Sequence, residues 1–169
     1  RLSGLKPKAV VIVATVRALK YNGGVPKADL NNENLEALEK GLPNLLKHVE
    51  NVTKVYGLPA VVAINAFPTD TKAELDLVEK KCNELGVNVA LSEVWAKGGE
   101  GGVKLAEEVL KLVEKNGQHT YVYDSNLSIK EKIEAICTKV YGADGVDYTP
   151  NASKTIADFE KLGFGNMPI

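Results

Sequence analysis

The fold of this chain is decided by the stretch Lys8-Ala9-Val10-Val11-Ile12-Val13-Ala14, a short apolar run rich in β-branched residues. Its apolar residues do not alternate with polar ones, which is typical of a parallel strand covered on both faces. Similar runs occupy residues 59–65 and 88–91, and a fourth strand is predicted at residues 120–123. We therefore expect residues 8–14 to form a central strand of a parallel sheet.

Helical patterns fill the connections between these strands. Thr71 and Ser128 each stand three residues before a glutamate, and this capping-box pattern predicts a helix beginning beside each of them. Apolar spacing predicts two further helices, at residues 103–115 and 152–162. Strands and helices thus alternate along the chain.

The longest connection, residues 35–52, contains Gly41 and Pro43, which predict that one helix stops and a second begins. The alternating order predicts an α/β fold with a doubly wound, mostly parallel sheet and helices on both faces. We divide the chain into residues 1–58 and residues 59–169, with one continuous domain as the alternative.

Composition limits the classes of partner. The chain has 169 residues, 44% apolar and 25% charged, with a net charge of −1, so we expect a small-molecule partner and neither nucleic acid nor membrane. No apolar run approaches the ~20 residues that span a bilayer, and no signal peptide is seen, so we expect a cytoplasmic protein. Cys82 and Cys137 are expected to be reduced core thiols, and His48 and His119 lack the spacing of a structural metal site.

Two loops that follow predicted strands carry aromatic residues. Phe67 and Pro68 follow the strand at 59–65, and Trp95 follows the strand at 88–91. Ligands of open α/β sheets bind outside the carboxyl ends of the strands, so the two rings can form the walls of a slot for a flat heterocycle. Ordinary core packing is the alternative. Asp70 is predicted either to cap the next helix or to orient a substrate amine.

The end of the first strand is polar. It delivers Arg17, Lys20 and Asn22, charged and polar groups that can hold an anion, just before a double glycine. A plain turn is the alternative. The glycine run at 98–102 precedes a helix whose N-terminal amides favour an anion, and a mobile loop without ligand is the second interpretation.

The segment at residues 13–24 resembles a signature of formate–tetrahydrofolate ligase, in which valine, alanine, a hydroxyl residue, arginine and lysine lead to a double glycine. Further segments extend the resemblance over nearly the whole chain; they are residues 63–71, 94–102, 141–146 and 159–168.

The resemblance implies an ATP-dependent ligase of one-carbon metabolism, cytoplasmic and homotetrameric. It would join formate to tetrahydrofolate through formyl phosphate, giving 10-formyltetrahydrofolate, with Mg²⁺ accompanying ATP. The family's phosphate loop is a glycine-rich run ending in lysine and serine or threonine, which this sequence lacks. We therefore expect that loop upstream of Arg1, and expect this chain to be a fragment of a larger P-loop-type ligase that is inactive alone.

By position, the resemblance assigns four residues to the pterin slot: Phe67, Pro68, Leu91 and Trp95. Weaker candidates for anion or substrate contacts are Arg17, Lys20, Asn22, Asn65, Lys97 and Glu100. None of these residues is assigned a catalytic role, and the expected macromolecular partners are the remaining part of the same enzyme and further copies of it. The alternatives are a non-catalytic folate- or nucleotide-binding module and an inactive folded remnant.

Overall fold

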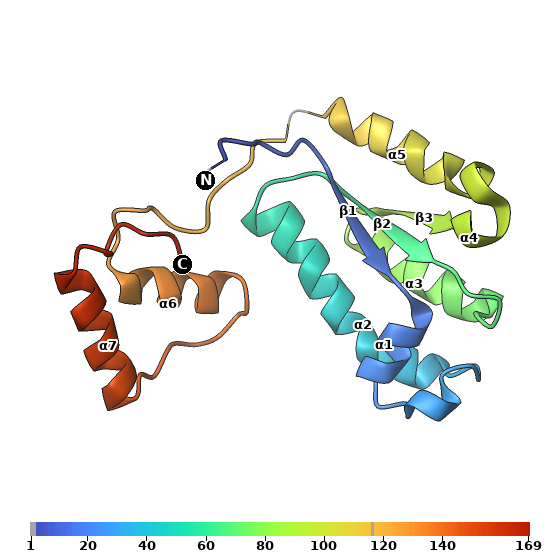
Figure 1. Ribbon diagram of the computed structural model, residues 1–169. Helices are drawn as coiled ribbons and strands as arrows, with labels where there is room; N and C mark the ends of the chain where they lie inside the picture. Colours follow the sequence, from blue (N-terminus) through green and yellow to red (C-terminus); the bar gives the residue numbers. More distant parts are fainter. Residues whose placement is uncertain (1–2, 116) are drawn as a thin grey trace. The chain divides into compact units, whose positions relative to one another are not determined.

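The computed structural model of the chain describes residues 3–115 and 117–169, which form two compact units, residues 1–119 and residues 120–169 (Figure 1). The elements in chain order are β1 (Val10–Ala14), α1 (Val16–Asn22), η1 (Lys27–Asp29), α2 (Leu35–Glu50), η2 (Asn51–Val55), β2 (Ala60–Asn65), α3 (Lys72–Glu84), β3 (Asn88–Ser92), α4 (Val94–Lys97), η3 (Gly98–Gly102), α5 (Val103–Val113), α6 (Ile129–Lys139) and α7 (Pro150–Lys161).

The first unit contains a parallel sheet with the strand order β1-β2-β3. Val10 stands opposite Ala60 in the first pairing, and Val61 stands opposite Asn88 in the second. Helices α1, α2 and α3 bury the main apolar core against one face, and α5 covers β2 and β3 on the other (Figure 1). The predicted α/β fold with a parallel sheet and helices on both faces is confirmed. The predicted division after residue 58 lies inside this unit, between two strands that pair.

The prediction that residues 8–14 form a central, doubly covered strand is wrong. Within the described sheet β1 is an edge strand, and Val11 and Val13 are 38% and 67% exposed because α5 packs over β2 and β3 instead. The central strand is β2, where Val61 and Val62 are fully buried. Two similar apolar runs therefore occupy different environments.

The predicted break in the longest connection is also wrong, because α2 continues through both Gly41 and Pro43. A Cβ atom at Gly41 would overlap the carbonyl oxygen of Leu19 on α1. The glycine is thus required for the close approach of α1 and α2 rather than for a helix stop.

The two capping boxes are present as predicted. Thr71 accepts a hydrogen bond from the Glu74 N–H at 3.3 Å, and the Glu74 carboxylate accepts one from the Thr71 N–H at 3.1 Å. Ser128 and Glu131 repeat this arrangement at the start of α6. Helix α7 begins two residues earlier than predicted because Thr149 provides its cap. Within the described residues, no helix combines the length and the apolar character that a bilayer crossing needs.

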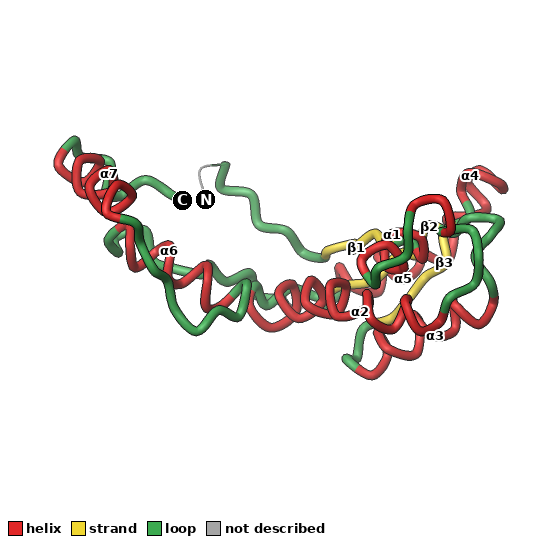
Figure 2. The backbone as a smooth tube through the Cα atoms, turned by 90° about the horizontal axis from the view of Figure 1, so that it is seen from below, coloured by secondary structure: helices red, strands yellow, loops and turns green. Residues whose placement is uncertain are grey.

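The second unit consists of helices and loops (Figure 2). Residues 120–123 form no strand in it, which corrects our prediction. The Tyr123 hydroxyl instead donates to the Ile169 carbonyl at 2.6 Å and so binds the C-terminal tail. Cys82 is a core thiol as expected, and burial raises its pKa to about 11. Cys137 on α6 is only partly buried, and both cysteines are free.

Candidate functional site

The carboxyl ends of β2 and β3 bring the two aromatic loops together. Asn65 stands opposite Ser92 at the end of the register, and the Ala66 N–H extends the pairing by donating to the Ser92 carbonyl at 3.1 Å. Phe67 follows directly on the β2 side, and Trp95 follows three residues later on the β3 side. Parallel strands place these loops at one edge of the sheet.

Trp95 is fixed beside the Phe67 loop by its indole nitrogen. Its Nε1–H donates to the Ala66 carbonyl at 2.7 Å, while the side chain remains 62% exposed. Phe67 is 37% exposed, so neither ring is sealed in the core. The core-packing alternative therefore does not describe either residue. The sequence analysis did not identify Ala66. This residue contributes its main-chain carbonyl, and a pattern of side chains cannot predict such a contact.

Strand β1 ends at the same edge, and Arg17 follows it. It lies in the first turn of α1, just after β1, and its guanidinium carbon stands 5.3 Å from the centroid of the Phe67 ring. A cation at this distance is attracted by the ring face. Helix α1 is fixed there because Thr15, its N-cap, accepts a hydrogen bond from the Ala18 N–H. The edge thus carries a cation against one aromatic ring.

The Phe67 loop is a tight turn closed by Asp70. The Asp70 N–H donates to the Phe67 carbonyl at 3.0 Å, and the Phe67 N–H donates to Oδ2 of Asp70 at 2.8 Å. Pro68, exposed at the second position of the turn, suits that position because its φ angle is fixed. Asp70 does not cap α3, since Thr71 does, so the predicted capping role is wrong.

Lys20 is not at the surface of the site. Its side chain is fully buried, with Nζ 2.8 Å from Oε1 of Glu74 and 2.8 Å from the Asn32 carbonyl it donates to. Burial acts to raise the pKa of Glu74, but the hydrogen bonds from Lys20 and from the Thr71 and Asn34 main chain hold that pKa below its usual value. The structure thus uses Lys20 to join α1 to α3, which contradicts its predicted contact with an anionic ligand.

The other predicted site residues occupy different positions around the edge. Leu91 is partly buried and packs against the main core, opposite Ile64. Lys97 forms an ion pair with Glu93 at 2.6 Å on the surface. Three further candidates are exposed: Asn22, Asn65 and Glu100.

The glycine run at 98–102 folds back onto the Trp95 loop as η3. The Glu93 N–H donates to the Gly101 carbonyl at 3.1 Å, and a Cβ atom at Gly101 would lie 2.5 Å from the carbonyl of Glu93. Gly98 has a φ of +57°, which favours glycine. These glycines therefore allow close backbone packing next to Trp95.

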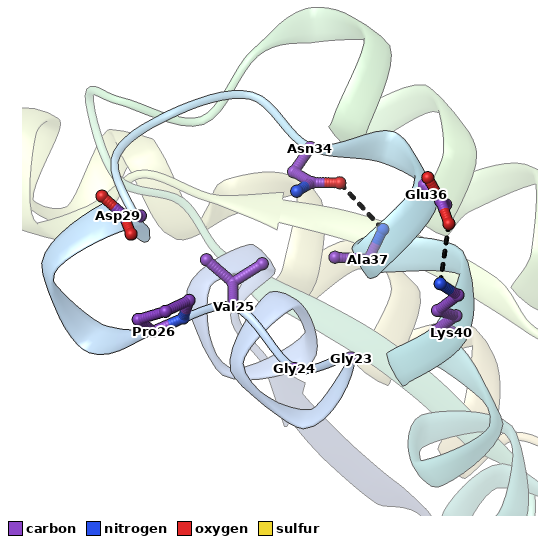
Figure 3. A pocket seen from close by; sticks show the side chains of 9 residues that line it. All are labelled: Gly23, Gly24, Val25, Pro26, Asp29, Asn34, Glu36, Ala37 and Lys40. Atoms are coloured by element: carbon purple, nitrogen blue, oxygen red, sulfur yellow. Dashed lines mark hydrogen bonds and ion pairs between the residues drawn. The ribbon is translucent and has the colours of Figure 1, made fainter.

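A hollow of about 340 Å³ lies beside the double glycine, between the end of α1 and the start of α2 (Figure 3). Two interactions join residues of its lining, because the Asn34 side chain accepts from the Ala37 N–H at 2.9 Å and Lys40 pairs with Glu36 at 2.7 Å. A Cβ atom at Gly23 would overlap the Ala37 carbonyl. The double glycine thus contributes to helix packing, and none of the predicted ligand residues lines this hollow.

The geometry describes an α/β protein whose candidate ligand edge carries two exposed aromatic side chains and a cation. Comparison with known families adds the class: the model of the formate–tetrahydrofolate ligase family matches residues 1–169. The chain belongs to the formate–tetrahydrofolate ligase family. That family consists of ligases for formate and tetrahydrofolate and implies ATP as the third substrate.

Proposed function

We propose that this chain supplies the folate slot of the ligase, with Phe67 and Trp95 as the walls that hold the pterin ring and with Pro68 and Leu91 at its margin. The observation that carries the proposal is the 2.7 Å hydrogen bond from the Trp95 indole to the Ala66 carbonyl. It anchors a largely exposed indole beside an exposed phenylalanine. Aromatic packing of this kind contributes about 0.5–1.5 kcal/mol per pair beyond the area buried.

The slot acts by positioning. In the proposed reaction, formate attacks the terminal phosphorus of ATP, releasing ADP and forming formyl phosphate. The folate amine then attacks the formyl carbon, phosphate leaves, and the amine loses a proton. Holding the amine beside this mixed anhydride makes the second step local and keeps water away from it. Arg17 and Asn65 are proposed contacts for the anionic groups, with Asn22 and Lys97 as weaker candidates. Glu100 is a weaker candidate for a contact with the pterin or the amine.

We assign ATP and Mg²⁺ to another part of the enzyme. The sequence contains no glycine-rich run ending in lysine and a hydroxyl residue, and the described residues contain no group of three or more metal-ligating side chains. The exposed face of β1, with Val11 and Val13, is where we propose that the remaining part of the ligase packs. We further propose that the isolated chain is inactive and that the parent enzyme is a cytoplasmic homotetramer.

A fluorescence titration tests the slot. Trp95 is the single tryptophan of the chain, so its emission reports this edge alone. Tetrahydrofolate added to the 169-residue chain should quench that emission, with free tryptophan amide as the optical control. Phe67→Ala should weaken the quenching, whereas Phe159→Ala, at an exposed phenylalanine of α7, should leave it unchanged.

The same measurement separates the alternatives. Absence of quenching and of heat in calorimetry would support the inactive remnant. If tetrahydrofolate quenches the emission but substitutions in this chain leave the turnover of the whole enzyme unchanged, the chain is a non-catalytic binding module. In the whole enzyme, Trp95→Ala should raise the KM for tetrahydrofolate about 2- to 10-fold, as the loss of one aromatic pair implies, with little change in the KM for formate. An unchanged folate KM would contradict the slot.

A further inference from the structure

The turn from Phe67 to Asp70 is closed by two hydrogen bonds, and only one of them is ordinary turn chemistry. The bond from the Asp70 N–H to the Phe67 carbonyl is the usual closure of a β-turn. The second bond, from the Phe67 N–H to Oδ2 of Asp70 at 2.8 Å, comes from the side chain. The Asp70 carboxylate therefore grips the backbone of the residue that carries the candidate aromatic wall.

This carboxylate is held in an unfavourable place. Among the described residues, the buried Oδ1 of Asp70 has no hydrogen-bond partner. Burial raises the pKa of Asp70, and the neighbouring Glu74 raises it further, against the Phe67 N–H and the more distant charges of Lys20 and Arg17. Asp70 is thus costly to ionise where it stands and does not cap the adjacent helix, and the hydrogen bond that its side chain accepts comes from the Phe67 backbone.

Arg17 lies over one face of the Phe67 ring. Its guanidinium carbon stands 5.3 Å from the Phe67 centroid. We propose that Asp70 is a positioning residue of the folate slot: it fixes the Phe67 backbone, and with it a ring that has Arg17 on one face and the other face left for the pterin. This inference rests on the function proposed above, and Asp70 acts through Phe67 without touching the substrate.

The test uses the whole enzyme and compares KM values for tetrahydrofolate, formate and ATP. Asp70→Ala removes a hydrogen bond to the backbone and should raise the folate KM about 3- to 10-fold, with the other KM values and kcat within about twofold. Asp70→Asn keeps an acceptor for the Phe67 N–H and should restore most of the loss. Asp76→Ala is the matched control, since Asp76 is an exposed aspartate on α3 paired with Lys72.

A double-mutant cycle distinguishes positioning from general destabilisation. If Asp70 acts through Phe67, then Asp70→Ala should change the folate KM less than twofold in a Phe67→Ala background. Equal effects in both backgrounds, or equal rises in all three KM values, would overturn the proposal. If Asp70→Ala does not fold, Asp70→Glu takes its place, because one extra methylene displaces the carboxylate from the Phe67 N–H.

The two proposals fail in different ways. If Trp95→Ala raises the folate KM and Asp70→Ala does not, the slot stands and the role of Asp70 is wrong. If neither substitution changes the folate KM, the slot itself is wrong. Thermal unfolding of each variant, measured beside the kinetics, should show Asp70→Asn at least as stable as the parent, because it removes a partly buried charge.

Discussion

Each of the two units buries one lysine completely, but the partners of the buried ammonium group differ. In residues 1–119, Lys20 meets the Glu74 carboxylate within a core of apolar side chains from the sheet and three helices. In residues 120–169, all of which the structure describes, Lys132 is the single buried residue. Its ammonium donates to the carbonyls of Gly165 and Met167 in the C-terminal tail. Lys20 is thus part of an apolar core, whereas Lys132 holds the C-terminal tail in a unit that has no other buried residue.

The difference teaches how each unit is held together. The first unit gains its stability from apolar burial. A charge inside such a core is costly unless its partner is present, so both members of the ion pair are needed. The second unit leaves an apolar hollow of about 440 Å³ open among its side chains. That hollow lies between α6, α7 and the tail, whose position depends on polar bonds from Lys132 and Tyr123. Loss of Lys20 should therefore destabilise the core of the first unit, and loss of Lys132 should release the C-terminal tail of the second.

The largest expected effect is that of Lys20→Met, which leaves the Glu74 carboxylate buried without its partner. We expect the free energy of unfolding of the first unit to fall by about 3–5 kcal/mol, measured by denaturant unfolding. The double variant Lys20→Met with Glu74→Leu should recover most of this loss. A loss below about 1 kcal/mol in the single variant would contradict the role of the pair.

Leu38→Ala tests the apolar side of the comparison. Leu38 is fully buried in the main core, so its truncation should cost about 2–5 kcal/mol through lost burial and the cavity left behind. Phe159→Ala in the second unit removes a larger but 46% exposed side chain and should cost less. If both substitutions cost the same on denaturant unfolding, the two units do not differ as we describe.

Lys132→Met should act on the tail. It leaves two carbonyls of the tail without their donor, at a cost of about 1–3 kcal/mol. Hydrogen exchange should show faster exchange in residues 163–169 and little change in the first unit. Lys154→Met, at an exposed lysine of α7, is the matched control. Unchanged exchange of the tail would show that Lys132 does not hold it.

The smallest effect is expected at the exposed face of β1. Val13→Thr should change the unfolding free energy of the isolated chain by less than about 0.5 kcal/mol, because the side chain is 67% exposed. The same change at the buried Val62 should cost more than 1 kcal/mol, since it buries a hydroxyl. A large loss at Val13 would mean that this face is covered in solution.

Local signals in the sequence predicted local structure well. The capping boxes at Thr71 and Ser128 were correct because both partners lie within one helical turn. The strand predicted at 120–123 was wrong because a strand needs a neighbour, and propensity does not provide one. Gly41 was misread as a stop because its contact, the Leu19 carbonyl, is more than twenty residues away along the chain.

In the candidate site, too, local features were predicted from the sequence and long-range contacts were not. The sequence placed Phe67 and Trp95 in the loops that follow two parallel strands, whose carboxyl ends meet at one edge of a sheet. The burial of Lys20 against Glu74, the Trp95 bond to Ala66 and the grip of Asp70 on Phe67 did not.

The sequence by itself determined the class of fold, the main helices and the loops that carry the aromatic rings, because periodicity and capping act over a few residues. Only the tertiary structure decided which apolar strand is central, which charge is buried and which backbone carbonyl holds the indole. Those outcomes depend on groups that meet across the sheet, where the distance in space is short and the distance along the chain is long.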